Sequence, residues 1–174
     1  MPAKGCEMIE REKLELIDRV NREIPASAST GPDAIWRKFI DIACSVYKCE
    51  AGSFFAADDA SRMLTLKCGI GKFSQDITNI SFSYEGIAGW CAQNRKSVLV
   101  NNVQQDPRFC NKVDSATGFT TKVMACVPAV SGVSLLGVIE LINPAKGVFT
   151  EEDRLLLDYL CAETAKSARS SVTA

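Results

Sequence analysis

Histidine is absent from the 174-residue chain. Its absence excludes imidazole-ligated zinc and haem sites, Ser-His and Cys-His nucleophile pairs, and a histidine general base. The chain also lacks any C-x-x-C pair, although it has eight cysteines, most of them within apolar segments. We therefore expect no metal site, and we interpret the cysteines as buried, reduced thiols that act as small hydrophobic side chains.

The chain also lacks a large net charge and long apolar runs. The net charge is −1 and the isoelectric point about 5.6, so no general basic field attracts nucleic acid or an anionic membrane. No apolar run approaches the roughly 18 residues that a membrane span needs. The first residues are charged and lack the apolar core of a signal peptide. We expect a cytoplasmic protein without nucleic-acid or membrane partners.

The hydrophobic pattern predicts helices at both ends of the chain and strands between them. Residues 1–31 are expected to form an amphipathic N-terminal helix, ended by Pro25, and a linker, and residues 32–170 one domain whose C-terminal helix is 150–170. Strands are expected at 51–57, 63–68, 77–82, 98–100, 122–127, 129–131 and 135–142, with Pro128 as a strand end, and a short helix at 86–94. This order predicts an α+β fold, with about six antiparallel strands and the N- and C-terminal helices packed on one face of the sheet.

Glu140 is the one charge within the apolar segment LLGVIELIN. A carboxylate in a core strand must find a partner or shift its pKa. Alternatively, strict strand alternation places it on the solvent side of the sheet. The sequence alone leaves both possibilities open.

Two segments carry a resemblance to a known family: EGIAGWCAQNRKSVLVNNVQQDPRFCNKVDSATGFTTKVMACVPA and LLGVIELINPAKGVFTEED. Over about Ala34 to Ala168 the chain resembles a GAF domain of the type found in cyclic-nucleotide phosphodiesterases and bacterial adenylyl cyclases. The Asn-Lys-Phe-Asp-Glu signature of that type falls on Asn111, Lys112, Phe149 and Asp153, and Arg154 replaces its final acid.

In the family, this signature ties a loop over the ligand pocket to the last helix. The resemblance thus implies a Lys112–Asp153 link that fixes a lid formed by residues 103–121. Alternatively, Asp153 only completes a capping box with Thr150 and complements the helix dipole. The two possibilities are compatible.

The resemblance also implies the residues of a ligand pocket. Backbone amides of Ile87 and Ala88, at the start of the short helix, would meet an anionic group of the ligand, although Gly86 and Gly89 beside them are also compatible with mere tight packing. Further ligand-binding positions carried over from the family are Ser53, Lys67, Cys68, Asp114, Thr117, Thr121 and Glu140. Lys67 and Cys68 depart from the aromatic and acidic pair of guanine-binding relatives, which leaves cyclic AMP or another small metabolite open beside cyclic GMP.

The resemblance implies a non-enzymatic sensory and regulatory module in signal transduction, with a small ligand such as a cyclic nucleotide. We expect a homodimer through the terminal helices and a separate signalling protein as output. Two alternatives are a purely structural dimerisation or protein-interaction domain, and a cysteine-based free methionine sulfoxide reductase. The thiols on which such a reductase would depend are Cys68, Cys91, Cys110 and Cys126.

Overall fold

The structure is a computed structural model that describes residues 4–71, 79–111, 114–115 and 118–171, with side chains from residue 10 onward. The helices are α1 (Lys4–Ser27), α2 (Pro32–Tyr47), α3 (Gly86–Asn94) and α5 (Glu151–Ser170), with short 3-10 turns at Ala28–Thr30 and Val103–Gln105. The strands are β1 (Ala51–Asp58), β2 (Met63–Ile70), β3 (Ser81–Ser83), β4 (Val98–Val100), β5 (Met124–Ser131) and β6 (Ser134–Ile142). In this part of the chain, no helix is long and apolar enough to cross a membrane.

The strands form one sheet in the order β3-β2-β1-β6-β5-β4, and every neighbouring pair is antiparallel. The four long strands occupy the middle of the sheet, and the two three-residue strands, β3 and β4, form its edges. The α+β prediction with about six antiparallel strands is therefore confirmed.

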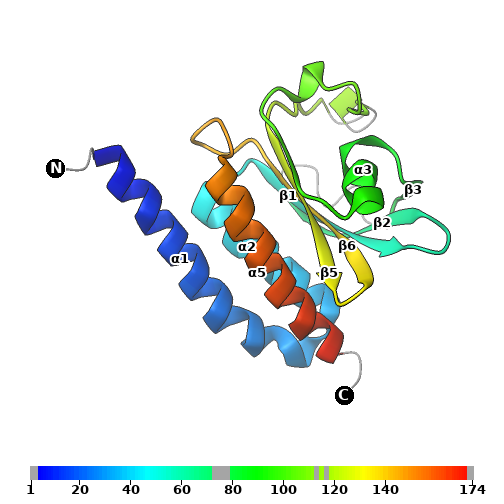
Figure 1. The fold of residues 1–174 in the computed structure, drawn as a ribbon, viewed down its shortest axis with the longest axis horizontal. Helices are drawn as coiled ribbons and strands as arrows, with labels where there is room; N and C mark the ends of the chain where they lie inside the picture. The colour runs from blue at the N-terminus through cyan, green and yellow to red at the C-terminus, as the bar shows by residue number, and fades with distance from the viewer. Residues whose placement is uncertain (1–3, 72–78, 112–113, 116–117, 172–174) are drawn as a thin grey trace.

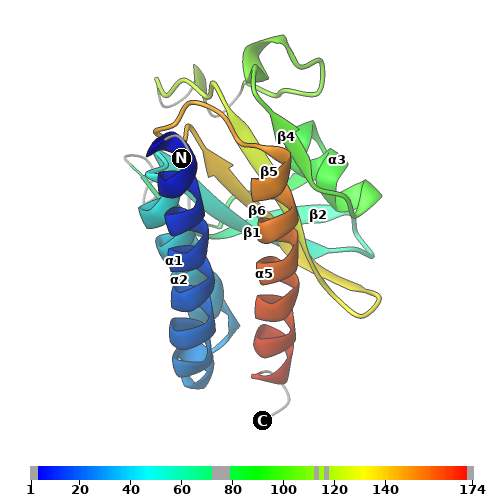
Figure 2. The ribbon, with the colours of Figure 1, turned by 60° about the vertical axis from the view of Figure 1, so that its left-hand side comes forward.

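The three long helices cover one face of the sheet, whereas α3 lies on the other (Figure 1). Within the helix layer, α1 and α5 run side by side in the same direction, and α2 runs opposite to both (Figure 2). The predicted packing of the N- and C-terminal helices on one face is thus confirmed.

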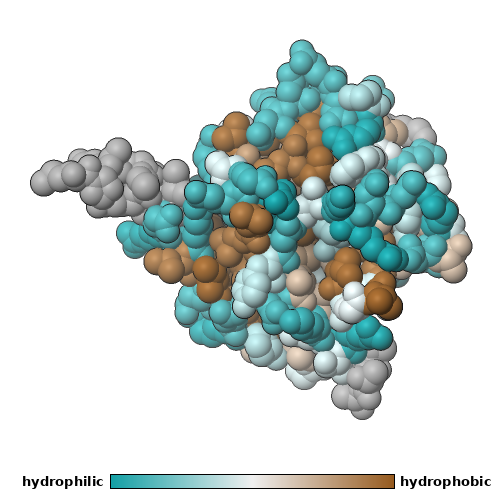
Figure 3. All heavy atoms as spheres, in the orientation of Figure 1, coloured by the Kyte–Doolittle hydropathy of each residue, from teal (hydrophilic) through white to brown (hydrophobic). Residues whose placement is uncertain are grey.

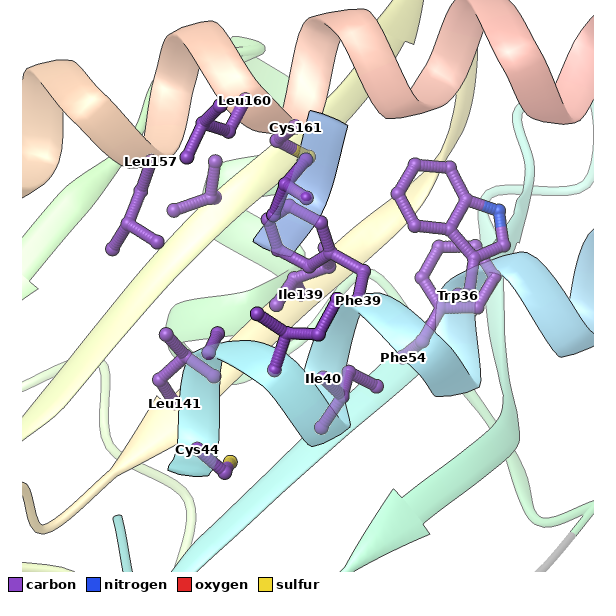
Figure 4. Close-up of a cluster of buried hydrophobic side chains, with 14 of the residues drawn as sticks. Trp36, Phe39, Ile40, Cys44, Phe54, Ile139, Leu141, Leu157, Leu160 and Cys161 are labelled. Atoms are coloured by element: carbon purple, nitrogen blue, oxygen red, sulfur yellow. The ribbon is translucent and has the colours of Figure 1, made fainter. Parts of the chain in front are cut away.

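The main core lies between this helix layer and the sheet. Trp36 of α2 stacks on Phe54 of β1, with ring centroids 4.6 Å apart, and Phe39 packs beside them (Figure 4). Leu157, Leu160 and Cys161 close this core from α5. Burial of so many large side chains is the dominant stabilisation of the fold, and it fixes the sheet as a rigid platform for the opposite face.

Two proline-based predictions were wrong. Helix α1 continues through Pro25 to Ser27, because a proline this close to the helix end removes only one hydrogen bond there. Pro128 does not end a strand but lies within β5, opposite Val138 of β6. Strand β4 pairs only with residues 124–126 of β5, so β5 has no neighbour on that side at Pro128, and a proline is tolerated at such an edge.

Candidate functional site

The side chains of β1 alternate between the two faces of the sheet. Phe54 points to the helix layer, whereas Phe55 packs on the α3 side, with its ring 5.3 Å from that of Phe82. Ser53 is two residues from Phe55 and therefore shares its face. The predicted site residue Ser53 accordingly lies on the α3 side of the sheet.

Glu140 lies in the middle of β6, directly opposite Ser53 of β1 and Cys126 of β5. No hydrogen bond or ion pair reaches its carboxyl group from the residues that the structure describes. Burial raises the pKa of this carboxyl group to about 7, although part of the residue stays open to solvent. Such a carboxyl group can form a hydrogen bond with a partner that does not belong to the chain.

The first turn of α3 faces this region and leaves amide groups uncapped. Glu85, at the N-cap position, makes no side-chain capping bond, and the first bond of the helix runs from the Gly89 amide to the Glu85 carbonyl at 2.9 Å. The amides of Ile87 and Ala88 belong to the turn that has no carbonyl acceptor within its own helix. Unpartnered amides at a helix start form a positive end that suits an anion.

The two glycines of this turn have different tasks. A Cβ on Gly89 would stand 2.2 Å from the carbonyl carbon of Tyr84, so Gly89 allows direct backbone packing. Gly86 adopts a positive φ of 67°, and a Cβ on it would stand 3.7 Å from its nearest neighbours, Arg108 and Cys110. Packing thus explains Gly89, whereas backbone conformation explains Gly86.

Asp114 and Thr121, two of the predicted ligand contacts, bond to each other. Asp114 accepts from the Thr121 amide at 2.8 Å and from its hydroxyl at 2.7 Å, and Thr121 is 3% exposed. Gln104 donates to the Thr121 carbonyl at 2.8 Å. These bonds hold Gln104, Asp114 and Thr121 together within the segment 103–121. The predicted positions Thr117 and Lys112 lie outside the described residues.

Arg108 joins the same segment to α3, a contact that no sequence pattern predicted. Its guanidinium forms two bonds to Asp106, at 2.9 and 2.6 Å, and lies over the Trp90 ring, 4.8 Å from the centroid. The pair lowers the pKa of Asp106 through the hydrogen bonds from Arg108. A bidentate ion pair stacked on an aromatic ring holds this part of the segment on the helix.

Cys68 does not belong with the other predicted site residues. It packs in the core under the helix layer, opposite Phe54, whereas Leu66 packs on the α3 side. The register skips one residue between Phe54 and Phe55, so that Lys67 is the extra residue of a bulge. Strict alternation would place Cys68 on the α3 side with Leu66, but the bulge turns it to the helix layer. We therefore leave Cys68 out of the candidate site.

Asp153 is a buried junction at the start of α5. It is 1% exposed and accepts bonds from Lys146 at 2.6 Å and from the amide and hydroxyl of Thr150, and the Thr150 hydroxyl accepts from the Asp153 amide. The capping box is thereby confirmed. Burial opposes ionisation, but the bonds from Lys146 and Thr150 outweigh it, and the pKa of Asp153 is lowered. Among the residues that the structure describes, the cation bound to Asp153 is Lys146, in the loop before α5.

The other signature residues occupy separate places. Phe149 is buried, and its amide and carbonyl both bond to the side chain of Asn101, which thereby joins the end of β4 to the start of α5. Its ring contacts Tyr47 at a centroid distance of 5.6 Å. Asn111 is exposed, and its carbonyl accepts from the Ser115 amide at 2.8 Å.

Asn143 connects three segments, although no sequence pattern singled it out. Its side-chain oxygen accepts from the amides of Lys122 and Val123, and its side-chain nitrogen donates to Glu50 and to the Thr120 carbonyl. The residue has a φ of 52°, which asparagine tolerates better than most residues. An asparagine directly before a proline at a strand end was the only available signal.

The thiols on the α3 side are mostly inaccessible. Cys91 and Cys126 are fully buried and contact each other between α3 and β5, and burial first, then Cys91, raises the pKa of Cys126. Cys110 is half-buried in the segment 103–121. A fully buried thiol is a poor nucleophile, so among the thiols that the structure describes only Cys110 combines proximity to α3 with access to solvent.

A family model for the GAF domain matches residues 29–166. The chain belongs to the GAF domain family. The GAF domain is a regulatory and sensory fold. Over 131 residues the chain is 27% identical to a probable 3′,5′-cyclic phosphodiesterase of Caenorhabditis elegans, and over 77 residues it is 36% identical to the rod cGMP-specific 3′,5′-cyclic phosphodiesterase subunit alpha of Bos taurus. These matches cover 70% and 43% of this chain, but only 18% and 9% of the two relatives.

Solved GAF structures share the fold at low sequence identity. The GAF domain of a phosphoenolpyruvate-protein phosphotransferase from Coxiella burnetii aligns with a TM-score of 0.78 at 15% identity, over 98% of both chains. The free methionine-R-sulfoxide reductase from Neisseria meningitidis, solved in complex with its substrate, aligns with a TM-score of 0.75 at 17% identity, over 92% of both chains. At these identities the likeness shows a common fold and no common activity.

Proposed function

We propose that this GAF domain is a non-enzymatic regulatory module that binds a small ligand between the α3 side of the sheet, the start of α3 and the segment 103–121. The observation that carries the proposal is Glu140. Its carboxyl group has no hydrogen-bond or ion-pair partner among the described residues, and burial raises its pKa to about 7. A carboxyl group left in this state destabilises the fold, and a ligand that donates a hydrogen bond to it removes that cost.

The proposed ligand carries an anionic group and a separate hydrogen-bond donor. The uncapped amides of Ile87 and Ala88 suit the anion, and Glu140, on the strand opposite, suits the donor. A cyclic nucleotide offers both in one molecule, with a cyclic phosphate at one end and ring or exocyclic N–H groups at the other. The phosphodiesterase relatives, one of which is named as cGMP-specific, support this class.

Ser53 and Lys67 remain proposed contacts at the margin of this site. Ser53 lies beside Glu140 on the next strand, and Lys67 is the bulge residue of β2. Asp114 and Thr121 are proposed to act through the closure of the segment 103–121, since they bond to each other. Cys68 faces the helix layer, so no acidic or aromatic side chain at that position can contact the edge of a guanine base. This position therefore does not favour cyclic GMP over cyclic AMP.

We also propose that a second copy of the chain packs on the outer face of the helix layer. The large hydrophobic side chains Leu14 of α1 and Leu155 and Tyr159 of α5 are exposed, and Figure 3 shows apolar patches on this side of the molecule. A signal would leave the domain through these helices to a separate signalling protein. Sedimentation of the Leu155→Glu variant as a monomer, against a wild-type dimer, would support this arrangement; equal sedimentation would contradict it.

The reductase alternative has weaker support. Cys68 faces the helix layer, and Cys91 and Cys126 are fully buried, which leaves Cys110 as the one described α3-side thiol with access to solvent. A cysteine-based reductase needs a reachable thiolate and a resolving thiol. Turnover of free methionine sulfoxide with a thiol reductant, lost in Cys110→Ser, would replace the regulatory proposal with an enzymatic one.

Ligand binding is tested by thermal unfolding with cyclic AMP, cyclic GMP and a panel of small anionic metabolites at about 1 mM. A ligand present at about 100 times its dissociation constant should raise the melting temperature by about 5 °C or more. The same ligand should give little or no shift with Glu140→Gln, whereas Glu10→Gln, an exposed carboxyl on α1, should bind as wild type. If no compound shifts the wild-type protein, the domain is better described as a structural dimerisation module.

Glu140→Gln should also change the pH dependence of stability without any ligand. The folded-state pKa of Glu140 is raised from 4.5 to about 7, so its contribution is favourable below about pH 4.5 and is lost as the pH rises through 7. At about pH 8 the variant should melt about 4 to 8 °C above wild type, allowing for partial solvation of the carboxyl group. Near pH 5 the two proteins should melt together. An equal difference at both pH values would contradict the assigned burial.

A further inference from the structure

Two cysteine thiols meet at the C-terminal end of α2, on the opposite side of the sheet from the candidate ligand site. Lys48 ends the helix in the left-handed conformation, with a φ of 50°, and the Cys49 amide bonds back to the Cys44 carbonyl at 3.0 Å. This return is the Schellman arrangement, in which the side chains of its first and last residues come into contact, usually as an apolar pair. Here both positions are cysteines.

The Schellman return brings the two thiols close enough to interact. A hydrogen bond that the Cys49 thiol donates to Cys44, followed by burial, raises the pKa of Cys49. The Cys44 sulfur also lies against β1, since a Cβ on Gly52 would stand 2.6 Å from it. Figure 4 shows the Cys44 side chain on α2 at the margin of the main core.

The two thiols differ in access to solvent. Cys44 is 7% exposed, whereas Cys49 is half-buried. A reachable thiol in contact with a buried one is the geometry in which the first reacts with a reagent and the second resolves the product. Cys91 and Cys126 also touch, but both are fully buried, so that pair lacks the reachable member.

We propose that Cys44 and Cys49 are a redox-active dithiol, which a small-molecule disulfide such as glutathione disulfide oxidises to an intramolecular disulfide. The Cys49 thiol gives up its proton, and its sulfur attacks one sulfur of the reagent, which forms a mixed disulfide and releases one glutathione. The Cys44 thiol then gives up its proton, and its sulfur attacks that of Cys49 and releases the second glutathione. The protein loses two electrons and two protons, and the reagent gains both.

The surroundings of Cys49 set the rate of the first step. Cys44 on α2 disfavours the Cys49 thiolate, whereas Lys146 in the loop before α5 favours it, and Tyr47 lies near enough to interact. Because the thiolate is the attacking form and its pKa is raised, the reaction should be slow at neutral pH and faster in alkaline buffer. The site is therefore suited to sustained oxidation rather than to rapid turnover.

The position of the pair gives its oxidation a structural consequence. The next residue, Glu50, bonds through its amide to the Ile142 carbonyl and through its carboxylate to Asn143, which holds the start of β5. A disulfide between Cys44 and Cys49 would fix the corner from which these bonds extend. This inference is independent of the proposed ligand and goes beyond it.

Trypsin offers a direct test, because it cuts after Lys48, between the two cysteines. The folded protein is incubated with glutathione disulfide at about pH 8.5, where a larger fraction of Cys49 is thiolate than at neutral pH. Free thiols are then blocked, and the protein is digested without reduction. The proposal expects peptides 39–48 and 49–62, each with a single cysteine, to appear as one linked species lighter by two hydrogens than their sum, and to separate on reduction.

Variants identify the pair. Cys49→Ser should abolish the linked peptide, and Cys110→Ser, which changes another half-buried thiol, should leave its yield unchanged. The proposal is overturned if the wild-type digest shows both cysteines blocked as free thiols, if Cys49 stops at the mixed disulfide with glutathione, or if the link forms only in denaturant. The wild-type digest alone decides between these outcomes, so a variant that fails to fold does not weaken the test.

Discussion

Replacing Asn143 with alanine should lower the free energy of unfolding by about 3 to 4 kcal/mol. The side chain is 7% exposed and makes four hydrogen bonds between 2.8 and 3.1 Å. Alanine would leave the amides of Lys122 and Val123, the second of them buried, without their acceptor and would be less suited to the left-handed backbone at this position. Chemical denaturation should show a lower midpoint with an unchanged dependence on denaturant.

The two sides of the Asn143 network are separable. Asn143→Asp keeps the acceptor for the two amides but loses the donor and places a second carboxylate beside Glu50. This variant should therefore be destabilised by about 2 to 3 kcal/mol at neutral pH. Adding Glu50→Gln supplies a donor and should recover part of the loss, although Glu50→Gln alone should be nearly neutral. Additive effects of the two substitutions would contradict the contact.

Gly89→Ala should destabilise the domain by about 2 to 4 kcal/mol and abolish ligand-dependent thermal shifts. Its Cβ would stand 2.2 Å from the Tyr84 carbonyl carbon and 2.7 Å from the Tyr84 oxygen, so the start of α3 would have to move away from the chain that precedes it. The amides of Ile87 and Ala88 would move with it. Denaturation and the thermal-shift panel together measure both consequences.

Gly147→Ala is the matched control for this substitution. Gly147 has a positive φ of 82° but no atom within 4 Å of the Cβ position, so alanine there adds backbone strain without a clash. Its cost should be about 1 to 2 kcal/mol, and ligand shifts should remain. If Gly89→Ala is tolerated as well as a surface substitution, the close packing of α3 on Tyr84 is wrong.

The elements with strong local signals could be predicted from the sequence. The last helix begins at Glu151, close to the predicted start at residue 150, and the hairpin of β1 and β2 forms from the strands expected at 51–57 and 63–68. Capping and strand alternation are encoded within a few residues, so they are readable without tertiary context. The antiparallel α+β architecture follows from the order of these elements.

The candidate site was less predictable, because its geometry depends on non-local contacts. A single bulge residue, Lys67, turned Cys68 away from the α3 side, and no local pattern announces such a bulge. The bonds of Asn143 join residues 20 or more positions apart, and Arg108 finds the Trp90 ring only because α3 is packed beside its segment. The charge of Glu140 marked it as unusual in the sequence, but only the three-dimensional structure shows that its carboxyl group has no partner among the described residues.

The short edge strands of the sheet limit how molecules of this protein can associate. β3 and β4 each have three residues, and the four long strands lie between them. A foreign strand that added to either edge would find only a few backbone groups to pair with, so growth of the sheet from molecule to molecule is disfavoured. From Gly137 onward β6 is paired on both sides, by β1 and β5, and its apolar length is kept away from intermolecular pairing. Where β5 extends beyond β4, Pro128 lacks a backbone donor and Arg169 binds the Ser131 carbonyl, which makes this edge a poor template for another strand.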